Sequence, residues 1–157
     1  MKIKKLVILV LSMVFSFSCI SAVFASTNNE EYIRFHSNSD TRMDSDGYFD
    51  FTIRSRQRSD KFTANSDEIT IRIGAQIWDT SSQDYVKTSD TITVTLYTSL
   101  GIKVGSFTIN CDGYDKSKTF KVTDGKKYYF EVSADQSFSD RENLRIIGMG
   151  RVSPISL

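Results

Sequence analysis

Four aspartates lie within the eleven residues from 40 to 50. That stretch carries Asp40, Asp44, Asp46 and Asp50. Carboxylates grouped on one loop are ligands that calcium prefers. An EF-hand loop has acids at positions 1, 3 and 5 before a glycine at position 6; counted back from Gly47, position 1 is Arg42, so that motif fails. A looser calcium site at Asp40, Asp44 and Asp46, with Asn38 beside them, stays open, and the alternative is an Asp-Gly turn that leads into a β-strand.

Catalysis needs a positioned base or nucleophile, and this chain offers few. His36 is the only histidine, and Cys111 is the only cysteine beyond the first 25 residues. No serine is surrounded by nucleophile-elbow glycines, and neither HExxH nor a paired CxxC occurs. We interpret His36 as a residue at a strand end and Cys111 as a small buried hydrophobe. A Cys111–His36 pair or a pair of carboxylates would depend on tertiary proximity, so we predict no catalytic residues and a protein that is not an enzyme.

Three aromatic residues are candidates for ligand binding: Trp78, Tyr97 and Tyr129. In each local pattern the ring points away from the side that carries the aliphatic residues. Aromatic rings stack on the apolar faces of sugars, so rings gathered on one surface would suit a carbohydrate or a cell-wall polymer. The alternative is that Trp78 covers the edge of the core and that each ring is an isolated exposed aromatic.

A second candidate is a basic stripe in the segment TIRSRQRSDK. It consists of Arg54, Arg56 and Arg58, which alternate onto one strand face with Lys61 close by. Such a stripe would hold an anionic partner such as teichoic acid, a lipid headgroup or an acidic protein. The alternative is edge protection, in which outward charges prevent one sheet from pairing with another.

The first 25 residues have the layout of a secretory signal peptide. Lys2, Lys4 and Lys5 precede an apolar stretch from Leu6 to Phe15, and small residues lead to Val23-Phe24-Ala25. We expect cleavage after Ala25 and a secreted, extracellular product; an uncleaved anchor is the alternative, since residues 6–25 are almost long enough to span a bilayer. After cleavage we expect no stable membrane span.

The expected mature chain, residues 26–157, suits one domain with its own core. Three of the twenty basic residues leave with the signal peptide and all nineteen acidic residues stay, so the formal charge changes from +1 to −2. Such a balance gives no indication of nucleic-acid binding. One remaining cysteine forms no internal disulfide, so stability must come from packing. Residues 26–30 read as a disordered lead-in, and residues 31–157 as a single domain.

Hydrophobic residues alternate with polar ones through most of the mature chain, which is typical of half-buried antiparallel strands. The clearest segments are YFDFTIR, EITIRIGAQIW, ITVTLYT and KYYFEVS, and shorter ones are EYIRFH, DYVKT, IKVGSFTI, KTFKVT and NLRIIGMGRV. Leu100-Gly101 separates two of them, and Asp124-Gly125 predicts a type I′ hairpin between KTFKVT and KKYYFEV. No helical periodicity is sustained. The sequence therefore predicts an all-β protein, an antiparallel β-sandwich or jelly roll of about eight or nine strands.

The segments ITVTLYTSLGIKVGS and DGKKYYFEVS carry a likeness to a known family. With GYFDFTI, DEITIRI and LRIIGMGRV around them, the order of strands from roughly Gly47 to Val152 resembles the bacterial pre-peptidase C-terminal type of jelly-roll domain. Two features depart from that family: threonines replace the aspartate that opens its "D-L-Y-L" strand, and a longer hairpin, WDTSSQDYVKTSD, intervenes. The resemblance implies a jelly roll that acts as a non-catalytic module, as on secreted proteases, in secretion, folding or substrate attachment.

These observations favour a secreted, non-enzymatic β-sandwich that binds a cell-surface polymer or a protein partner, with no cofactor apart from the calcium considered above. Two alternatives stay open. One is a small exported effector, a toxin or inhibitor that acts on another cell, and the other is a minor secreted hydrolase.

Overall fold

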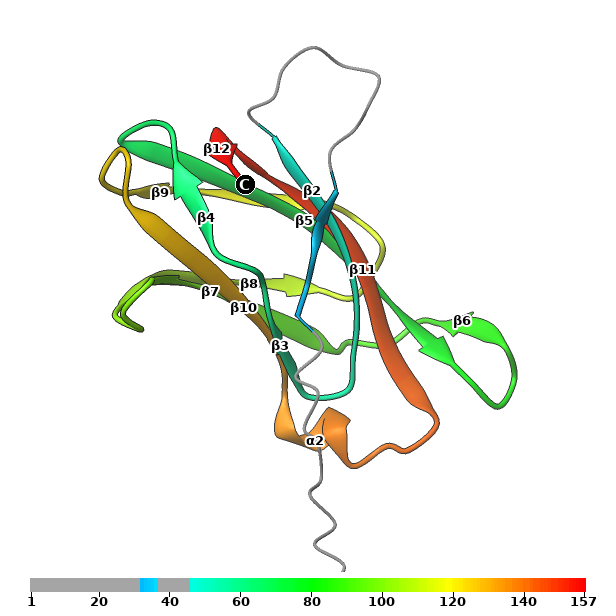
Figure 1. The fold of residues 1–157 in the computed structure, drawn as a ribbon. Helices are drawn as coiled ribbons and strands as arrows, with labels where there is room; N and C mark the ends of the chain where they lie inside the picture. Colours follow the sequence, from blue (N-terminus) through cyan, green and yellow to red (C-terminus); the bar gives the residue numbers. More distant parts are fainter. Residues whose placement is uncertain (1–31, 37–45) are drawn as a thin grey trace, which may run out of the picture.

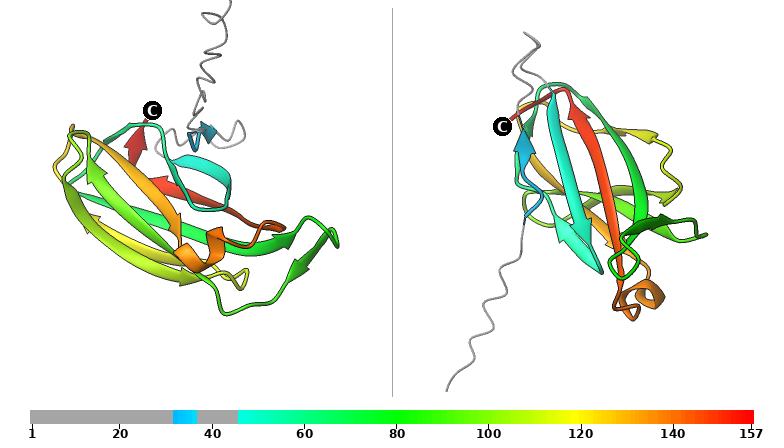
Figure 2. Two further views of the ribbon diagram at one scale, coloured as in Figure 1. Left: turned by 90° about the horizontal axis from the view of Figure 1, so that it is seen from below. Right: turned by 90° about the vertical axis from the view of Figure 1, so that its right-hand side faces the viewer.

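The computed structural model describes residues 32–36 and 46–157. In this part of the chain two antiparallel sheets of six strands each pack face to face (Figures 1 and 2), which confirms the all-β sandwich predicted from the alternation. The signal peptide, the lead-in and residues Asp40 and Asp44 lie outside the described residues. No helix in the described ranges is long and apolar enough to cross a membrane.

The first sheet has the order β1–β2–β11–β5–β6, with β9 paired to the first half of β5. Its strands are β1 (Phe35–His36), β2 (Gly47–Ile53), β11 (Leu144–Ser153), β5 (Glu68–Asp79), β6 (Asp84–Val86) and β9 (Lys116–Lys121). The β5–β6 hairpin projects beyond the rest of the sandwich, on the right in Figure 1.

The second sheet has the order β12–β4–β10–β7–β8, with β3 paired to β10. Its strands are β12 (Ile155–Ser156), β4 (Phe62–Ala64), β10 (Lys127–Ala134), β7 (Thr91–Thr98), β8 (Lys103–Asn110) and β3 (Arg56–Arg58). A single helical turn, α2 (Gln136–Ser139), connects β10 to β11. The three strands that the sequence did not predict are β3, β4 and β12, which have two or three residues each, too few to show a period of two.

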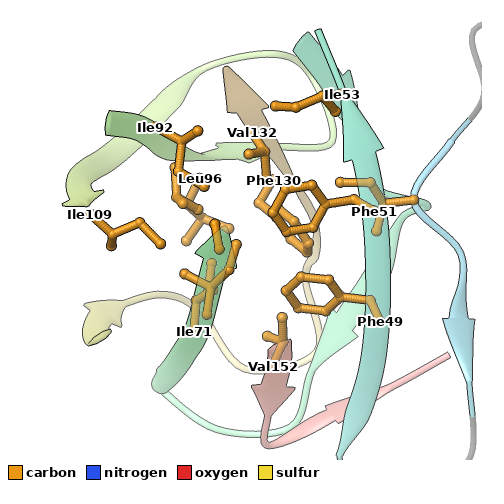
Figure 3. Packing of buried hydrophobic residues seen from close by; sticks show 14 of the residues in the cluster. Phe49, Phe51, Ile53, Ile71, Ile92, Leu96, Ile109, Phe130, Val132 and Val152 are labelled. Carbon is orange, nitrogen blue, oxygen red and sulfur yellow. The ribbon is translucent and has the colours of Figure 1, made fainter. Parts of the chain in front are cut away.

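The core lies between the sheets and is built by the inward residues of each alternating strand (Figure 3). From β2, Phe49, Phe51 and Ile53 point toward Phe130 and Val132 of the facing sheet, and all five are at most 4% exposed. Ring centroids of Phe49 and Phe130 are 4.7 Å apart. The buried apolar faces of the two sheets therefore hold the sandwich together.

Two glycines of β11 let β2 place its large rings in the core. Gly148 is the cross-strand partner of Phe51, and Gly150 is the partner of Phe49. A Cβ added at either glycine would overlap the ring of its partner and a backbone oxygen of β5. The rings therefore occupy the space that side chains on β11 would have filled.

The turn at Asp124-Gly125 is not the hairpin that the sequence predicted. It connects β9 of the first sheet to β10 of the second, so the two strands that flank it are not paired. Of the two central residues of this turn, Gly125 alone has a positive φ (71°), whereas a type I′ turn needs a positive φ at both. The hairpin at Leu100-Gly101 does form, because β7 and β8 are neighbours and Gly101 adopts a φ of 85°.

Candidate functional site

A groove of about 530 Å³ runs across the outer face of the first sheet. Its lining comes from β1, β2, β11, β5 and the segment before β9, and consists of His36, Tyr48, Phe49, Asp50, Arg72, Asp115, Met149, Gly150 and Arg151. A volume of this size is typical of sites that hold small ligands.

Strand register brings these residues together from distant parts of the sequence. Arg151 of β11 is the cross-strand partner of both Arg72 on β5 and Tyr48 on β2, and Tyr48 in turn pairs with His36 on β1. Because cross-strand partners lie about 4.5–5.5 Å apart, these four side chains form one row on the solvent face. Met149 follows in the next row and is 70% exposed.

One histidine–aspartate hydrogen bond and two arginine–aspartate ion pairs set the electrostatics of the groove. His36 Nε2 lies 2.6 Å from Asp50 Oδ1, Arg72 Nε lies 2.9 Å from Asp115 Oδ2, and Arg151 Nη1 lies 3.3 Å from Asp46 Oδ2. All three pairs are open to solvent, so each contributes at most about 1 kcal/mol to stability. Their effect is to present fixed donors and acceptors side by side.

Gly74 allows Asp115 to lie over the floor of the groove. A Cβ at position 74 would collide with Asp115 Oδ1, whereas the nearest backbone atom is 3.6 Å away. The missing side chain therefore leaves room for the carboxylate that orients Arg72.

The predicted aromatic set divides between the two sheets. Trp78 lies on β5, on the same face as Arg72, and its ring meets Tyr85 of β6 edge to face at 5.0 Å. Tyr97 and Tyr129 are cross-strand partners on β7 and β10 of the other sheet and stack at 5.3 Å with an interplanar angle of 15°. Trp78 therefore shares a surface with the groove, and the two tyrosines lie on the opposite sheet.

The predicted arginine stripe is also divided, because the chain crosses from one sheet to the other after β2. Arg54 follows the end of β2 and donates a hydrogen bond to the Ser139 backbone oxygen at 3.2 Å. Arg56 and Arg58 belong to β3 of the second sheet, where Arg58 Nε donates to Glu131 Oε2 at 2.9 Å. The prediction that all three arginines share one strand face is wrong, since a strand switch interrupts the alternation.

Of the three aspartates predicted to bind calcium, only Asp46 lies within the described residues, where it pairs with Arg151. No group of three or more histidine, cysteine or acidic side chains with metal-binding proximity occurs across residues 32–36 and 46–157. A calcium site at Asp40 and Asp44 remains a prediction outside these ranges.

The structure separates His36 from Cys111. His36 is exposed in the groove, whereas Cys111 is 2% exposed and belongs to the hydrophobic core, which confirms its interpretation as a buried residue. Burial, with Asp90 and Asp112 nearby, raises the pKa of the Cys111 thiol to about 12. A thiol with this pKa is protonated at neutral pH and is a poor nucleophile.

The groove was not predicted from the sequence, although the alternation placed Asp50 and Arg72 on the outward faces of their strands. A signal was present: Tyr48 and Asp50, Met149 and Arg151, and Arg72 each carry a polar or large side chain on the solvent face of a strand. The sequence does not show which strands are neighbours, so these residues could not be assigned to one surface.

Neither a protein-family model nor a curated protein sequence matches this chain. Among solved structures, the fold is similar to PliG, a periplasmic inhibitor of g-type lysozyme from Aeromonas hydrophila, with 10% identity over 80% of this chain and 96% of that one, at a TM-score of 0.48. It is also similar to a family two carbohydrate esterase from Cellvibrio japonicus, at a TM-score of 0.39 and 10% identity. The match covers 80% of this chain and 30% of that one. A third similar structure is that of CBM51-2 in complex with GlcNAc and INT domains from Clostridium perfringens ZmpB, at a TM-score of 0.39 and 13% identity. The match covers 69% of this chain and 22% of that one.

The two six-stranded antiparallel sheets make the protein a β-sandwich, and the groove lies on the outer face of its first sheet. Fold class alone does not assign a function.

Proposed function

We propose that the protein is exported and binds a neutral polysaccharide of a cell surface, without catalysing a reaction. The observation that supports this most directly is the groove on the first sheet. Guanidinium groups donate hydrogen bonds and carboxylates accept them, and here Arg72, Arg151, Asp50 and Asp115 line the same groove as the ring of Tyr48. Sugar hydroxyls both donate and accept, so this combination suits them.

The charge of the groove favours a neutral ligand. Among the charged residues that line it, Arg72 and Arg151 are balanced by Asp50 and Asp115. An anionic polymer such as teichoic acid would meet these two carboxylates, and Asp46 already pairs with Arg151. We therefore place neutral sugar chains ahead of anionic ones for this surface.

The Trp78–Tyr85 pair extends the proposed site along β5. Trp78 lies six residues beyond Arg72 on the same face, about 20 Å at the usual rise of a strand. Tyr85 is 54% exposed. Rings at this distance would stack on a sugar further along the chain, so the ligand we propose is an extended polymer.

The expected signal peptide and the resemblance to pre-peptidase C-terminal jelly rolls agree with an exported, non-catalytic binding role. Serine, threonine and cysteine are absent from the described residues that line the groove, so it holds none of these three nucleophiles.

The test is retention on purified bacterial cell wall and on a panel of immobilised neutral and acidic oligosaccharides. We expect Arg72→Ala to weaken retention on a neutral glycan by about tenfold or more, because it removes a charge-assisted donor and leaves Asp115 unpaired. Arg72→Lys should restore little of this, since an ammonium lacks the planar fork. Trp78→Ala should weaken retention on long oligosaccharides and leave short ones unaffected.

Arg56→Ala is the matched control, because Arg56 is an exposed arginine on the other sheet. Its retention should equal that of the wild type. Equal retention of the Arg72→Ala and wild-type proteins on every glycan would refute the groove as the binding site. Stronger retention on acidic glycans that Arg56→Ala abolishes would instead support the arginines of β3.

A further inference from the structure

The tip of the β7–β8 hairpin exposes two aliphatic side chains. Leu100 is 86% exposed, the highest value among the large hydrophobic residues of the described chain, and Ile102 is 64% exposed. They flank Gly101, whose positive φ closes the turn. Scattered single hydrophobic residues need no explanation, whereas two at one projecting tip form a small apolar surface.

The hairpin holds this tip outward. The Thr98 backbone N–H donates to Ile102 O at 2.9 Å, Gly101 N–H donates to Thr98 O at 2.9 Å, and Ile102 N–H donates to the Thr98 hydroxyl at 3.1 Å. These bonds fix the backbone on both sides of Leu100. The two side chains are therefore presented to solvent by a closed turn.

Tyrosines lie directly behind the tip. Tyr97 and Tyr129 stack on each other, and the Tyr129 hydroxyl is 3.8 Å from where a Cβ of Gly101 would lie. The Arg58 guanidinium lies 5.8 Å from the centre of the Tyr129 ring. Tyrosine has an apolar body and a polar tip, and it is enriched where a protein meets the interface of a bilayer.

Lysines flank the same end of the sandwich. Lys103 follows the tip and pairs with Tyr97, and the backbone oxygen of Lys127 accepts a hydrogen bond from Ser99 N–H at 2.9 Å, with Lys126 next to it. The hairpin from Thr91 to Asn110 contains no acidic residue. The acids Asp67 and Asp124 lie at the neighbouring turns, which appear at the same end in Figures 1 and 2.

We propose that this tip, defined as Leu100, Ile102, Tyr97, Tyr129, Lys103 and Lys127, contacts the surface of a bilayer that contains anionic phospholipid. Two exposed aliphatic side chains with tyrosines and lysines beside them combine the residue types that meet the acyl chains, the interface and the anionic headgroups of a bilayer. The hairpin carries Lys103 and no acidic residue, which favours an anionic headgroup surface as its partner. Contact through two aliphatic side chains is weak and reversible, which suits a protein that also holds a surface polymer at its other sheet.

The test is flotation with vesicles of phosphatidylcholine mixed with phosphatidylglycerol, compared with phosphatidylcholine alone. We expect binding to the mixed vesicles and at least a tenfold loss in the double variant Leu100→Ser with Ile102→Ser. Lys103→Gln and Lys127→Gln should each weaken binding by about fivefold, the effect of one lysine near an anionic surface, and added salt should reduce that difference.

Tyr114→Ser is the matched control, because Tyr114 is 78% exposed in the β8–β9 connection, away from the tip. It should float like the wild type. Melting curves of all variants should coincide, since the substituted residues are exposed. Equal flotation of the Leu100→Ser, Ile102→Ser variant and the wild type would overturn the proposal. So would absence of flotation together with tip-dependent binding to a protein.

Discussion

Replacement of Gly148 by alanine tests how the two sheets share space. A Cβ at position 148 would collide with the Phe51 ring and lie 2.6 Å from the backbone oxygen of Gly74. A buried ring and a backbone oxygen cannot both move away cheaply, and overpacking of this kind costs about 1–3 kcal/mol. The loss of chain entropy in the unfolded state returns about 0.4–1 kcal/mol, so we expect a net loss of about 1–2 kcal/mol in the free energy of unfolding.

The assay is urea denaturation of the wild type, Gly148→Ala, Phe51→Leu and the double variant. Leucine at position 51 removes the atoms that the new methyl group meets, so the double variant should be at least about 1 kcal/mol more stable than the sum of the single effects predicts. Gly74→Ala is the control, because its Cβ meets only the end of the exposed Asp115 side chain. It should change stability by less than about 0.5 kcal/mol, while it weakens glycan retention by displacing Asp115 from Arg72.

Two outcomes would refute this account of the packing. One is a Gly148→Ala protein that unfolds at the same urea concentration as the wild type. The other is strict additivity with Phe51→Leu, which would mean that the methyl group and the ring do not compete for the same space.

Two further predictions concern pH. The pKa of the Cys111 thiol is raised from 9.0 to about 12, so as pH rises the thiol of the unfolded chain loses its proton first. The free energy of unfolding of the wild type should therefore fall between pH 9 and 12, by about 1.4 kcal/mol per pH unit from this group. In urea titrations Cys111→Val should lack that part of the slope, and an identical slope would contradict the assignment. Burial raises the pKa of Asp90, but hydrogen bonds from Arg141 and Thr88 outweigh burial and lower the pKa from 3.8. The ionised Asp90 therefore stabilises the fold above pH 3.8, and this stabilisation is lost as pH falls through the lower pKa of the folded state. Asp90→Asn should cost about 1 kcal/mol at neutral pH, because it removes a charged hydrogen-bond partner of the partly exposed Arg141, and less at acidic pH. A cost that does not change with pH would argue against the ion pair.

Local pattern was enough to predict the faces of individual strands. Phe49, Phe51 and Ile53 were expected on one side of their strand, and all three point into the core. The two strands on either side of Leu100-Gly101 were predicted for the same reason, and the structure shows that they pair as a hairpin. The short strands β3, β4 and β12 were not predictable, because they exist only through pairing with other strands.

The sequence by itself determined the class of fold and the inward faces of the longer strands, because the period of two is a property of the strand backbone and is visible in any window of several residues. Only the tertiary structure decided which strands are neighbours. It placed β9 and β10 in different sheets, moved Arg54 away from Arg56 and Arg58, and separated Trp78 from Tyr97 and Tyr129. It also joined Arg151 to Asp46, 105 residues earlier, and to Arg72 across β11 and β5. Hydrogen bonds between strands that are distant in the sequence decide which strands are neighbours. The groove forms because the pairing of β1, β2, β11 and β5 brings its lining residues together.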